Sequence, residues 1–152
     1  MAKGVLKQRV PADDASNEDK RKAQRERSRA FGIEALEGKG ENLSFPKGFP
    51  TKLSDYGDPV NLKYPLAPDA RARAARAYFK RFAGEYKRTS SKRVVHTRIV
   101  ERLLAIGAKP SFNNSDPLDK LLPAGLVRRM KEAARQAARK AELAGDLLEL
   151  LL

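Results

Sequence analysis

The sequence predicts a mainly α protein, with a helical hairpin, a long C-terminal helix and an extended N-terminal half rich in Pro and Gly. Apolar residues at helical spacing over 69–106 and a heptad pattern over 130–151 predict the helices. Between Gly38 and Pro59, seven Gly and Pro residues break any such periodicity, which predicts turns and extended chain. At 152 residues, the chain is expected to form one domain, or a small domain with tails.

Residues 1–30 are predicted to form a basic N-terminal arm with one polar helix. Ser16, with Asp19 three residues later, has the pattern of an N-terminal cap. The helix over 18–29 is charged on nearly all sides, and only Ala23 and the adjoining Ala30 are available for burial. Because a helix that is polar all round is marginal alone, the arm is expected either to fray in solvent or to be ordered by a polyanion or a partner.

Residues 31–68 are predicted to be an extended Pro/Gly-rich segment. Aromatic and aliphatic residues recur through it, so it is too apolar for a free tail. Such a segment is expected to lie across a surface, which is either the protein's own helices or another subunit. The small number of predicted helices favours another subunit.

Residues 69–110 are predicted to form a basic helical hairpin. One helix should run from Ala70 to about Ala83 after an Asp69 cap, and a second from a cap within 89–91 to Ile106. The short loop between them favours antiparallel packing. The expected buried faces are Ala70, Ala74, Ala77, Tyr78 and Phe82 on the first helix, and Val95, Ile99, Leu103 and Ile106 on the second.

Residues 111–152 are predicted to form a polar turn and a C-terminal heptad helix. The helix should start at Ala124 after Pro123, and Gly145 could end it early. Two interpretations remain open: the helix packs on the protein's own hairpin, or it docks on a partner or self-associates with 147–152 as its anchor. The heptad seam comprises Met130, Ala134, Ala137, Ala141, Ala144, Leu148 and Leu151.

Positive charge is concentrated in the hairpin. The formal net charge is +13, and residues 71–110 alone carry +10. Such a block is expected to bind polyanions such as double-stranded DNA without sequence specificity, or an acidic protein surface, although a solvated charged face is the simpler interpretation. The candidate binding residues are Arg71, Arg73, Arg76, Lys80, Arg81, Lys87, Arg88, Lys92, Arg93, Arg98 and Arg102.

The residue types give no support for catalysis. The chain has no Cys and a single His, His96, so we expect no disulfide, metal site or cofactor. Asp55 and Asp58 lie in a loop, where a turn role is favoured over acid–base chemistry. The stretch 38–40 lacks the rest of a phosphate-binding loop. No apolar run is long enough for a membrane span, and no secretory signal is recognised. We therefore expect a protein that is not an enzyme and does not associate with membranes.

Six short stretches carry recognisable motifs, namely 29–33, 37–40, 46–50, 57–65, 73–79 and 98–108. Together they resemble a phage-associated helical domain of unknown function. In the same order, that family has a "KYGI" opening, a Gly-rich turn, a Pro-rich stretch, a DPVNYxYP-type motif, a helix with an "RAA..Y(W/F)" pattern and a second helix that closes in a "K.GI"-like turn. The resemblance covers about residues 27–110, and it departs from the family at Leu62 and in the more basic helix pair.

The resemblance implies a phage setting, since the family is found near phage head genes and fused to head-maturation protease-like proteins. It transfers no catalytic residue. We expect an accessory structural protein of a virion, in the head or head–tail region, that binds phage structural proteins and has DNA or a second copy of itself as further candidate partners. The alternative is a free nucleic-acid-binding or host-regulating phage protein in the bacterial host cytoplasm. The expected partner anchors are Phe45, Phe49, Tyr56, Tyr64, Leu147, Leu148 and Leu151.

Overall fold

The computed structural model describes residues 8–38 and 42–152 and confirms a mainly α protein. Lys39 and Gly40 of the Gly-rich turn, and the first seven residues of the arm, lie outside the described residues. Within the described part, the four α-helices are α1 (Asn17–Phe31), α2 (Asp69–Phe82), α3 (Thr89–Ala105) and α4 (Ala124–Leu151), and short 3₁₀ helices lie at Leu53–Asp55, Ala83–Glu85 and Asp119–Leu121.

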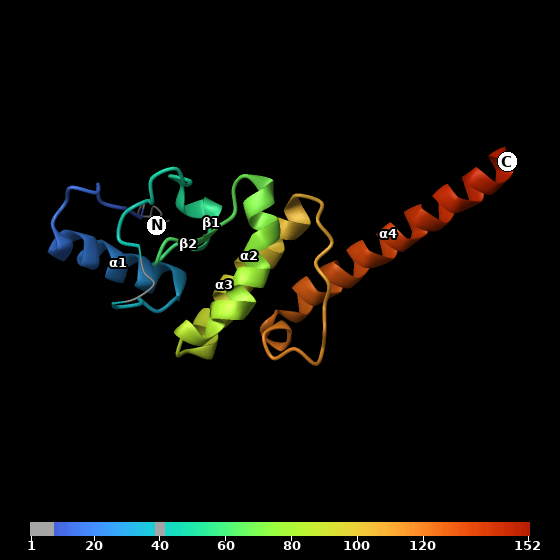
Figure 1. Ribbon diagram of the computed structural model, residues 1–152. Coiled ribbons are helices and arrows are strands. Elements are labelled where there is room, and N and C mark those ends of the chain that lie inside the picture. The colour runs from blue at the N-terminus through green and yellow to red at the C-terminus, as the bar shows by residue number, and fades with distance from the viewer. Residues whose placement is uncertain (1–7, 39–41) are drawn as a thin grey trace, which may run out of the picture.

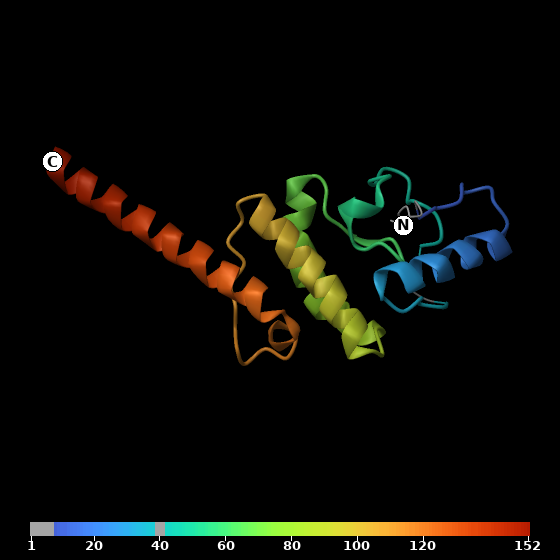
Figure 2. The same ribbon diagram turned by 180° about the vertical axis from the view of Figure 1, so that it is seen from behind.

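The molecule is elongated, with α2 and α3 side by side at its centre (Figures 1 and 2). At one end lie α1 and a two-stranded antiparallel sheet, β1 (Tyr56–Asp58) and β2 (Lys63–Pro65), in which Tyr56 pairs with Pro65 and Asp58 with Lys63. From the other end α4 projects away from the rest of the chain. This arrangement separates a packed body, residues 8–38 and 42–122, from a protruding helix.

Helix α1 is docked on the protein's own chain rather than frayed or dependent on a partner. Ser16 is its N-cap and accepts a hydrogen bond from the Asp19 amide at 3.1 Å, as the cap pattern predicts. Three residues of the helix are buried, namely Ala23, Gln24 and Arg27. The Arg27 side chain donates to the carbonyl oxygens of Pro59 and Val60. The sequence did not reveal this docking, because it is made by polar side chains.

Segment 31–68 is covered by the protein's own helices, so the preference for a partner surface was wrong. Ile33, Leu36, Val60, Tyr64 and Leu66 are buried in one cluster with residues of α2 and α3. Tyr56 is fully buried and Tyr64 nearly so; both predicted partner anchors are therefore core residues. Two helices are enough to bury these apolar residues, because the turn-rich chain folds closely over them instead of running across a wide surface.

The buried face of α2 is not the predicted one. Its buried residues are Ala72, Ala75 and Phe79, and Ala83 continues the same face. Ala residues are so frequent in this helix that either face satisfies a helical spacing, and both faces carry aromatic rings, so the spacing alone does not determine which face is buried. The predicted residues Ala70, Ala74, Ala77, Tyr78 and Phe82 are instead exposed.

Helix α3 buries Val95, Ile99 and Leu103 as predicted, whereas Ile106 is only partly buried. Its N-cap is Arg88, and no side chain of the predicted caps performs that role. Instead, the Glu34 carboxylate accepts the amides of Lys87 and Arg88 at 2.7 and 2.8 Å. Likewise, α2 begins at Asp69 after a Pro68 N-cap without a side-chain bond. A distant acidic residue thus substitutes for a local cap at α3.

Asp58 and Asn61 form a buried polar node in the turn between the strands. Asp58 accepts hydrogen bonds from the Val60 and Asn61 amides at 3.0 Å, from the Asn61 side chain at 2.8 Å, and from the Tyr86 hydroxyl. Asn61 in turn accepts from Gln24 of α1 and from the Leu36 amide. Burial raises the pKa of Asp58. The turn role expected of Asp58 is confirmed, and the node also joins α1 to the hairpin.

Gly57 allows β1 to approach α3 closely. A Cβ atom at this position would lie 2.8 Å from Cγ1 of Ile99 and 3.2 Å from Cβ of Tyr64. Both neighbours are buried, so neither can move away without disturbing the core.

We predict that Gly57→Ala lowers the free energy of unfolding by about 1–3 kcal/mol, the usual cost of overpacking. The measurement is urea denaturation of both proteins. Gly84→Ala is the matched control, because an added Cβ there meets nothing within 4 Å. Equal effects of the two substitutions would contradict the close approach.

Candidate interaction surfaces

Helix α4 is attached to the body only through its first two turns. Leu126 and Met130 pack with Val100 of α3 and Leu122 in a small apolar cluster. From Lys131 to Leu152, every residue is exposed except the partly buried Ala133 and Ala137. The interpretation that α4 packs on the hairpin of the same chain therefore holds only for the first two turns of α4.

The end of α4 exposes a cluster of large apolar side chains. Leu147 is 59%, Leu148 62% and Leu151 81% exposed. Leu143, Leu150 and Leu152 are exposed as well. Gly145 does not interrupt the helix, which continues to Leu151. The three leucines predicted as partner anchors thus lie at the surface, where an anchor must lie. We call the six residues the leucine end.

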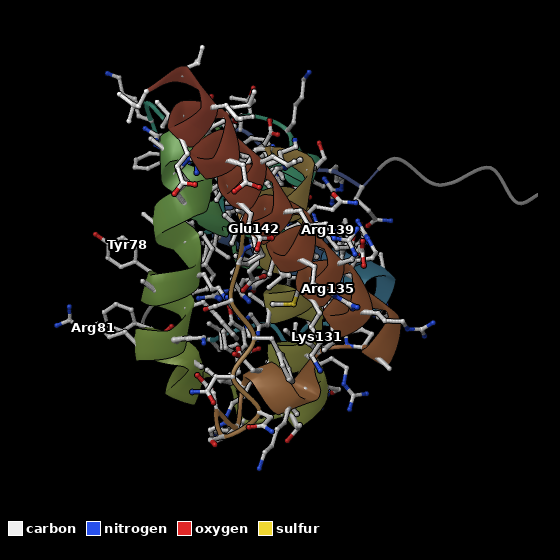
Figure 3. All side chains as sticks on the ribbon, turned by 90° about the vertical axis from the view of Figure 1, so that its right-hand side faces the viewer. Tyr78, Arg81, Lys131, Arg135, Arg139 and Glu142 are labelled. Atoms are coloured by element: carbon white, nitrogen blue, oxygen red, sulfur yellow. The ribbon has the colours of Figure 1, made fainter. Side chains whose placement is uncertain are left out.

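Charged residues form a row along one side of α4. Figure 3 shows Lys131, Arg135 and Arg139 one above another on this helix, with Glu142 beside Arg139. Among them only Arg135 makes an ion pair within the described chain, with Glu132 at 3.8 Å. The Lys131 ammonium lies 5.3 Å from the ring centre of Phe112. The row therefore faces solvent and is available to a partner.

Two basic residues of the hairpin, Arg76 and Lys80, hold α2 to the segment that precedes α4. The Arg76 guanidinium lies 2.9 Å and the Lys80 ammonium 3.0 Å from the buried Asp119 carboxylate. Lys80 also pairs with Asp116 at 2.8 Å. Burial alone would raise the pKa of Asp119, but the Asn113 amide and these two cations together lower it. Both cations are thus structural, contrary to their predicted role in polyanion binding.

Four more of the predicted binding residues donate to backbone carbonyl groups of the body. Arg98 donates to Tyr56 O at 3.0 Å, and Arg102 to Ser54 O at 2.9 Å and to the Asp55 carboxylate at 3.0 Å. Arg71 donates to Gly48 O and Arg93 to Leu121 O. These side chains satisfy carbonyl oxygens of β1, of two short 3₁₀ helices and of a turn. A polyanion would have to compete for them.

Five predicted binding residues remain available, namely Arg73, Arg81, Lys87, Arg88 and Lys92. Within the described residues their side chains have no ion pair or hydrogen bond, although Arg81 lies over the Phe82 ring. Arg73 and Arg81 lie on α2, and Figure 3 shows Arg81 and Tyr78 pointing away from the body. Lys87, Arg88 and Lys92 lie at the start of α3. The positive charge that remains available to a polyanion is therefore smaller than the sequence indicates, and it is split between α2 and the start of α3.

An apolar surface pocket lies between α2 and β2. Its volume is about 520 Å³, and the exposed Tyr78 and Phe82 of α2 line it together with Tyr64 and Phe49. Phe49, a predicted partner anchor, is 43% exposed and lies under the Arg71 guanidinium at 4.2 Å. Phe45, another predicted anchor, stacks on Tyr56 at 5.9 Å and is partly buried. Only Phe49 of the four aromatic anchors is thus at the surface.

His96 is buried between α2 and the 3₁₀ helix at Asp119–Leu121. Its Nδ1 lies 3.0 Å from Leu118 O, so Nδ1 carries the proton and donates it, and Nε2 accepts from Arg76 Nε at 3.2 Å. Burial lowers the pKa of His96 to about 4. The ring is therefore a neutral structural link within the core.

Comparison with known proteins yields no relative: no family model, no curated protein and no solved structure matches the chain. The resemblance to the phage-associated domain accordingly stays a prediction. In the part of the chain that the structure describes, no helix has the length and apolarity of a bilayer span, and no three acidic or His side chains gather as a metal site would require.

We predict that stability falls as the pH is lowered from 6.5 towards 4. The unfolded chain protonates His96 near pH 6.5 and the folded chain near pH 4, so the neutral ring's contribution is complete above pH 6.5 and decreases below it by up to about 3 kcal/mol. Because His96 is the one histidine, its NMR resonance reports this directly. The resonance should not titrate between pH 5 and 8, and a midpoint near 6.5 would contradict the buried neutral ring.

Proposed function

We propose that this protein is a non-catalytic accessory structural protein of a bacteriophage particle, in the head or head–tail region, and that it docks on a neighbouring subunit through α4. The observation that carries the proposal is the leucine end, six exposed leucines on a helix that contacts the body only at its base. In this proposal the hairpin and segment 31–68 form a rigid body that holds α4 in position.

The physical argument concerns the cost of leaving α4 bare. Most helical stability in proteins comes from packing of an amphipathic face, which α4 lacks beyond Met130, and each exposed leucine forgoes about 1.5–3 kcal/mol that full burial would contribute. Contiguous exposed apolar residues of this kind are typical of interaction sites. A partner that covers the leucine end would stabilise the helix and gain affinity at the same time.

The phage setting is supported by the motif resemblance and by what the motif does here. The stretch 57–65 contains Gly57, which allows the close approach to α3, and Asp58 and Asn61, which form the buried node. These are roles that a family would retain for its fold, so the shared motif fits a shared body. The more basic hairpin and the bare α4 would then adapt that body to a particular position in the particle.

The proposal is tested by mass spectrometry of purified particles of the phage that encodes the chain. The protein should be present, and the variant Leu147→Ser/Leu148→Ser/Leu151→Ser should be incorporated at least about tenfold less, because its anchor is lost. The control Tyr78→Ser/Phe82→Ser removes other exposed apolar side chains, from α2, and should be incorporated normally. Absence of the protein from particles contradicts the structural role, and normal incorporation of the leucine variant contradicts docking through α4.

A second function, sequence-independent nucleic-acid binding by the free protein, is favoured by the five available basic side chains. A fluorescent duplex should then bind without any capsid component, with an affinity that falls steeply with salt. Lys87→Gln/Arg88→Gln/Lys92→Gln should weaken binding about tenfold or more. The control Lys47→Gln/Lys52→Gln/Lys120→Gln removes the same charge from exposed positions elsewhere and should weaken it less. No binding at 50 mM salt would exclude this function.

A further inference from the structure

Four aromatic side chains gather around the pocket between α2 and β2. The chain has six Phe and four Tyr, and Phe49, Tyr64, Tyr78 and Phe82 line this one pocket. All of them except Tyr64 are exposed, so they leave apolar surface in water that a ligand would cover. The volume of about 520 Å³ lies within the range of small-molecule sites, roughly 300–1,000 Å³. Size and lining together make the pocket a candidate ligand site.

Two regular elements hold the walls of this pocket in place. β2 supplies Lys63, Tyr64 and Pro65, and α2 supplies Arg71, Ala74, Ala75, Tyr78 and Phe82. At 100° per residue, these five residues of α2 share one arc of about 100°. The Tyr64 ring packs edge-on against the buried Phe79 of α2, with 5.6 Å between the ring centres. The packing between strand and helix thus forms the pocket before any ligand arrives.

Positive charge surrounds the aromatic rings. Three basic side chains lie 4.2–5.6 Å from ring centres, namely Lys63 at Tyr64, Arg71 at Phe49 and Arg81 at Phe82. Lys63 is paired with Glu85, the acidic residue that lines the pocket. Arg71 donates to the carbonyl oxygens of Gly48 and Ala67, and neither Arg71 nor Arg81 forms an ion pair in the described part of the chain. Two positive charges beside the pocket are therefore without an acidic partner.

This charge favours an anionic ligand over a cationic one. Aromatic pockets can bind quaternary ammonium groups over their ring faces, but here the protein's own cations already lie over three of the rings. A ligand cation would meet like charges, whereas an anion would meet opposite ones. The planar guanidinium of Arg71 also matches a carboxylate, which can accept two parallel hydrogen bonds from it.

A buried donor at the pocket has no partner. Tyr64 is 7% exposed, and its hydroxyl is a buried polar group that makes no hydrogen bond within the described residues. Burial and the neighbouring Glu85 charge raise the pKa of Tyr64, so the hydroxyl keeps its proton at neutral pH. A buried hydroxyl without a partner is unfavourable, and an oxygen atom of a bound ligand would satisfy it.

We propose that this pocket binds a small aromatic carboxylate, with its ring between the aromatic walls and its oxygen atoms accepting from Arg71 and Tyr64. An aromatic body is favoured because ring pairs gain energy beyond the area that they bury. The remaining cation, Arg81, strengthens the attraction for the negative charge. The inference goes beyond the proposed function and does not depend on it, because the residues described as lining the pocket include none of α4.

Amide NMR titration of the full chain with three probes of one shape tests the inference. The probes are phenylbutyrate, phenylbutanol and phenylbutylammonium, which differ only in the charge of the head group. Phenylbutyrate should bind about fivefold more tightly than phenylbutanol or better, and phenylbutylammonium should bind most weakly. The shifted amides should be those of residues 63–64 and 71–82.

Substitutions at the pocket separate charge from shape. Arg71→Gln should weaken phenylbutyrate about tenfold, and the exposed Arg81→Gln about twofold to threefold. Neither should change the affinity for phenylbutanol, which reports whether the pocket keeps its shape. Arg73→Gln is the matched control, because it removes the same charge from the same helix about 150° away from the pocket side; it should change nothing.

Tyr64→Phe tests the unpaired hydroxyl. It should weaken phenylbutyrate and leave the free energy of unfolding of the free protein unchanged, because only a group without a partner is lost. An unchanged affinity for phenylbutyrate would contradict the assigned contact.

Equal affinities for the three probes, tighter binding of phenylbutylammonium, or no saturable shift overturn the inference. A capped phenylalanyl-glutamate peptide that binds more tightly than phenylbutyrate also overturns it, because the pocket would then fit a protein segment. Tyr78→Ser/Phe82→Ser should lose phenylbutyrate binding and still be incorporated into particles. Failure of the ligand inference therefore leaves docking through α4 intact, and failure of incorporation leaves the ligand site intact.

Discussion

The fold depends on how one buried carboxylate, Asp58, is satisfied. A carboxylate removed from water is very costly unless it is hydrogen-bonded or paired, and Asp58 receives four hydrogen bonds, from two turn amides, the Asn61 side chain and the Tyr86 hydroxyl. Tyr86 precedes α3, and Asn61 also bonds to Gln24 of α1. Burial and the neighbouring Asp58 charge raise the pKa of Tyr86, so the hydroxyl remains a donor. A single node thus joins three segments that are distant in the sequence.

Much of the positive charge has a structural origin. In the described residues of segment 31–68, the backbone pairs in a two-stranded sheet and in a few turn and loop hydrogen bonds, and arginine side chains donate to several of the remaining carbonyl oxygens. Arg27, Arg98 and Arg102 each bond to at least one of them. Burial lowers the pKa of Arg27 to about 10, an effect that the Asp58 charge partly offsets, and Arg27 stays charged at neutral pH. The net charge of the chain therefore overstates the charge available to a polyanion.

The sequence predicted what local periodicity determines and missed what depends on long-range contacts. The bounds of α2 and α3, the Ser16 cap and the heptad seam of α4 follow from spacing along one helix. The predicted buried face of α2 was wrong because its many Ala residues satisfy two faces and both faces carry aromatic rings. Tyr56 and Tyr64 were assigned to a partner because no pattern shows how closely an irregular segment folds over helices. Of the candidate sites, Leu147, Leu148 and Leu151 are placed where an anchor must lie.

The central claim is that α4 beyond Met130 is an interface that a neighbouring subunit covers, and hydrogen exchange of the full chain tests it most directly. The amides of residues 134–150 should exchange rapidly in the free protein and slowly in purified particles, while those of α3 stay protected in both. Protection of 134–150 that equals that of α3 in the free protein would contradict the account, because α4 would then need no partner.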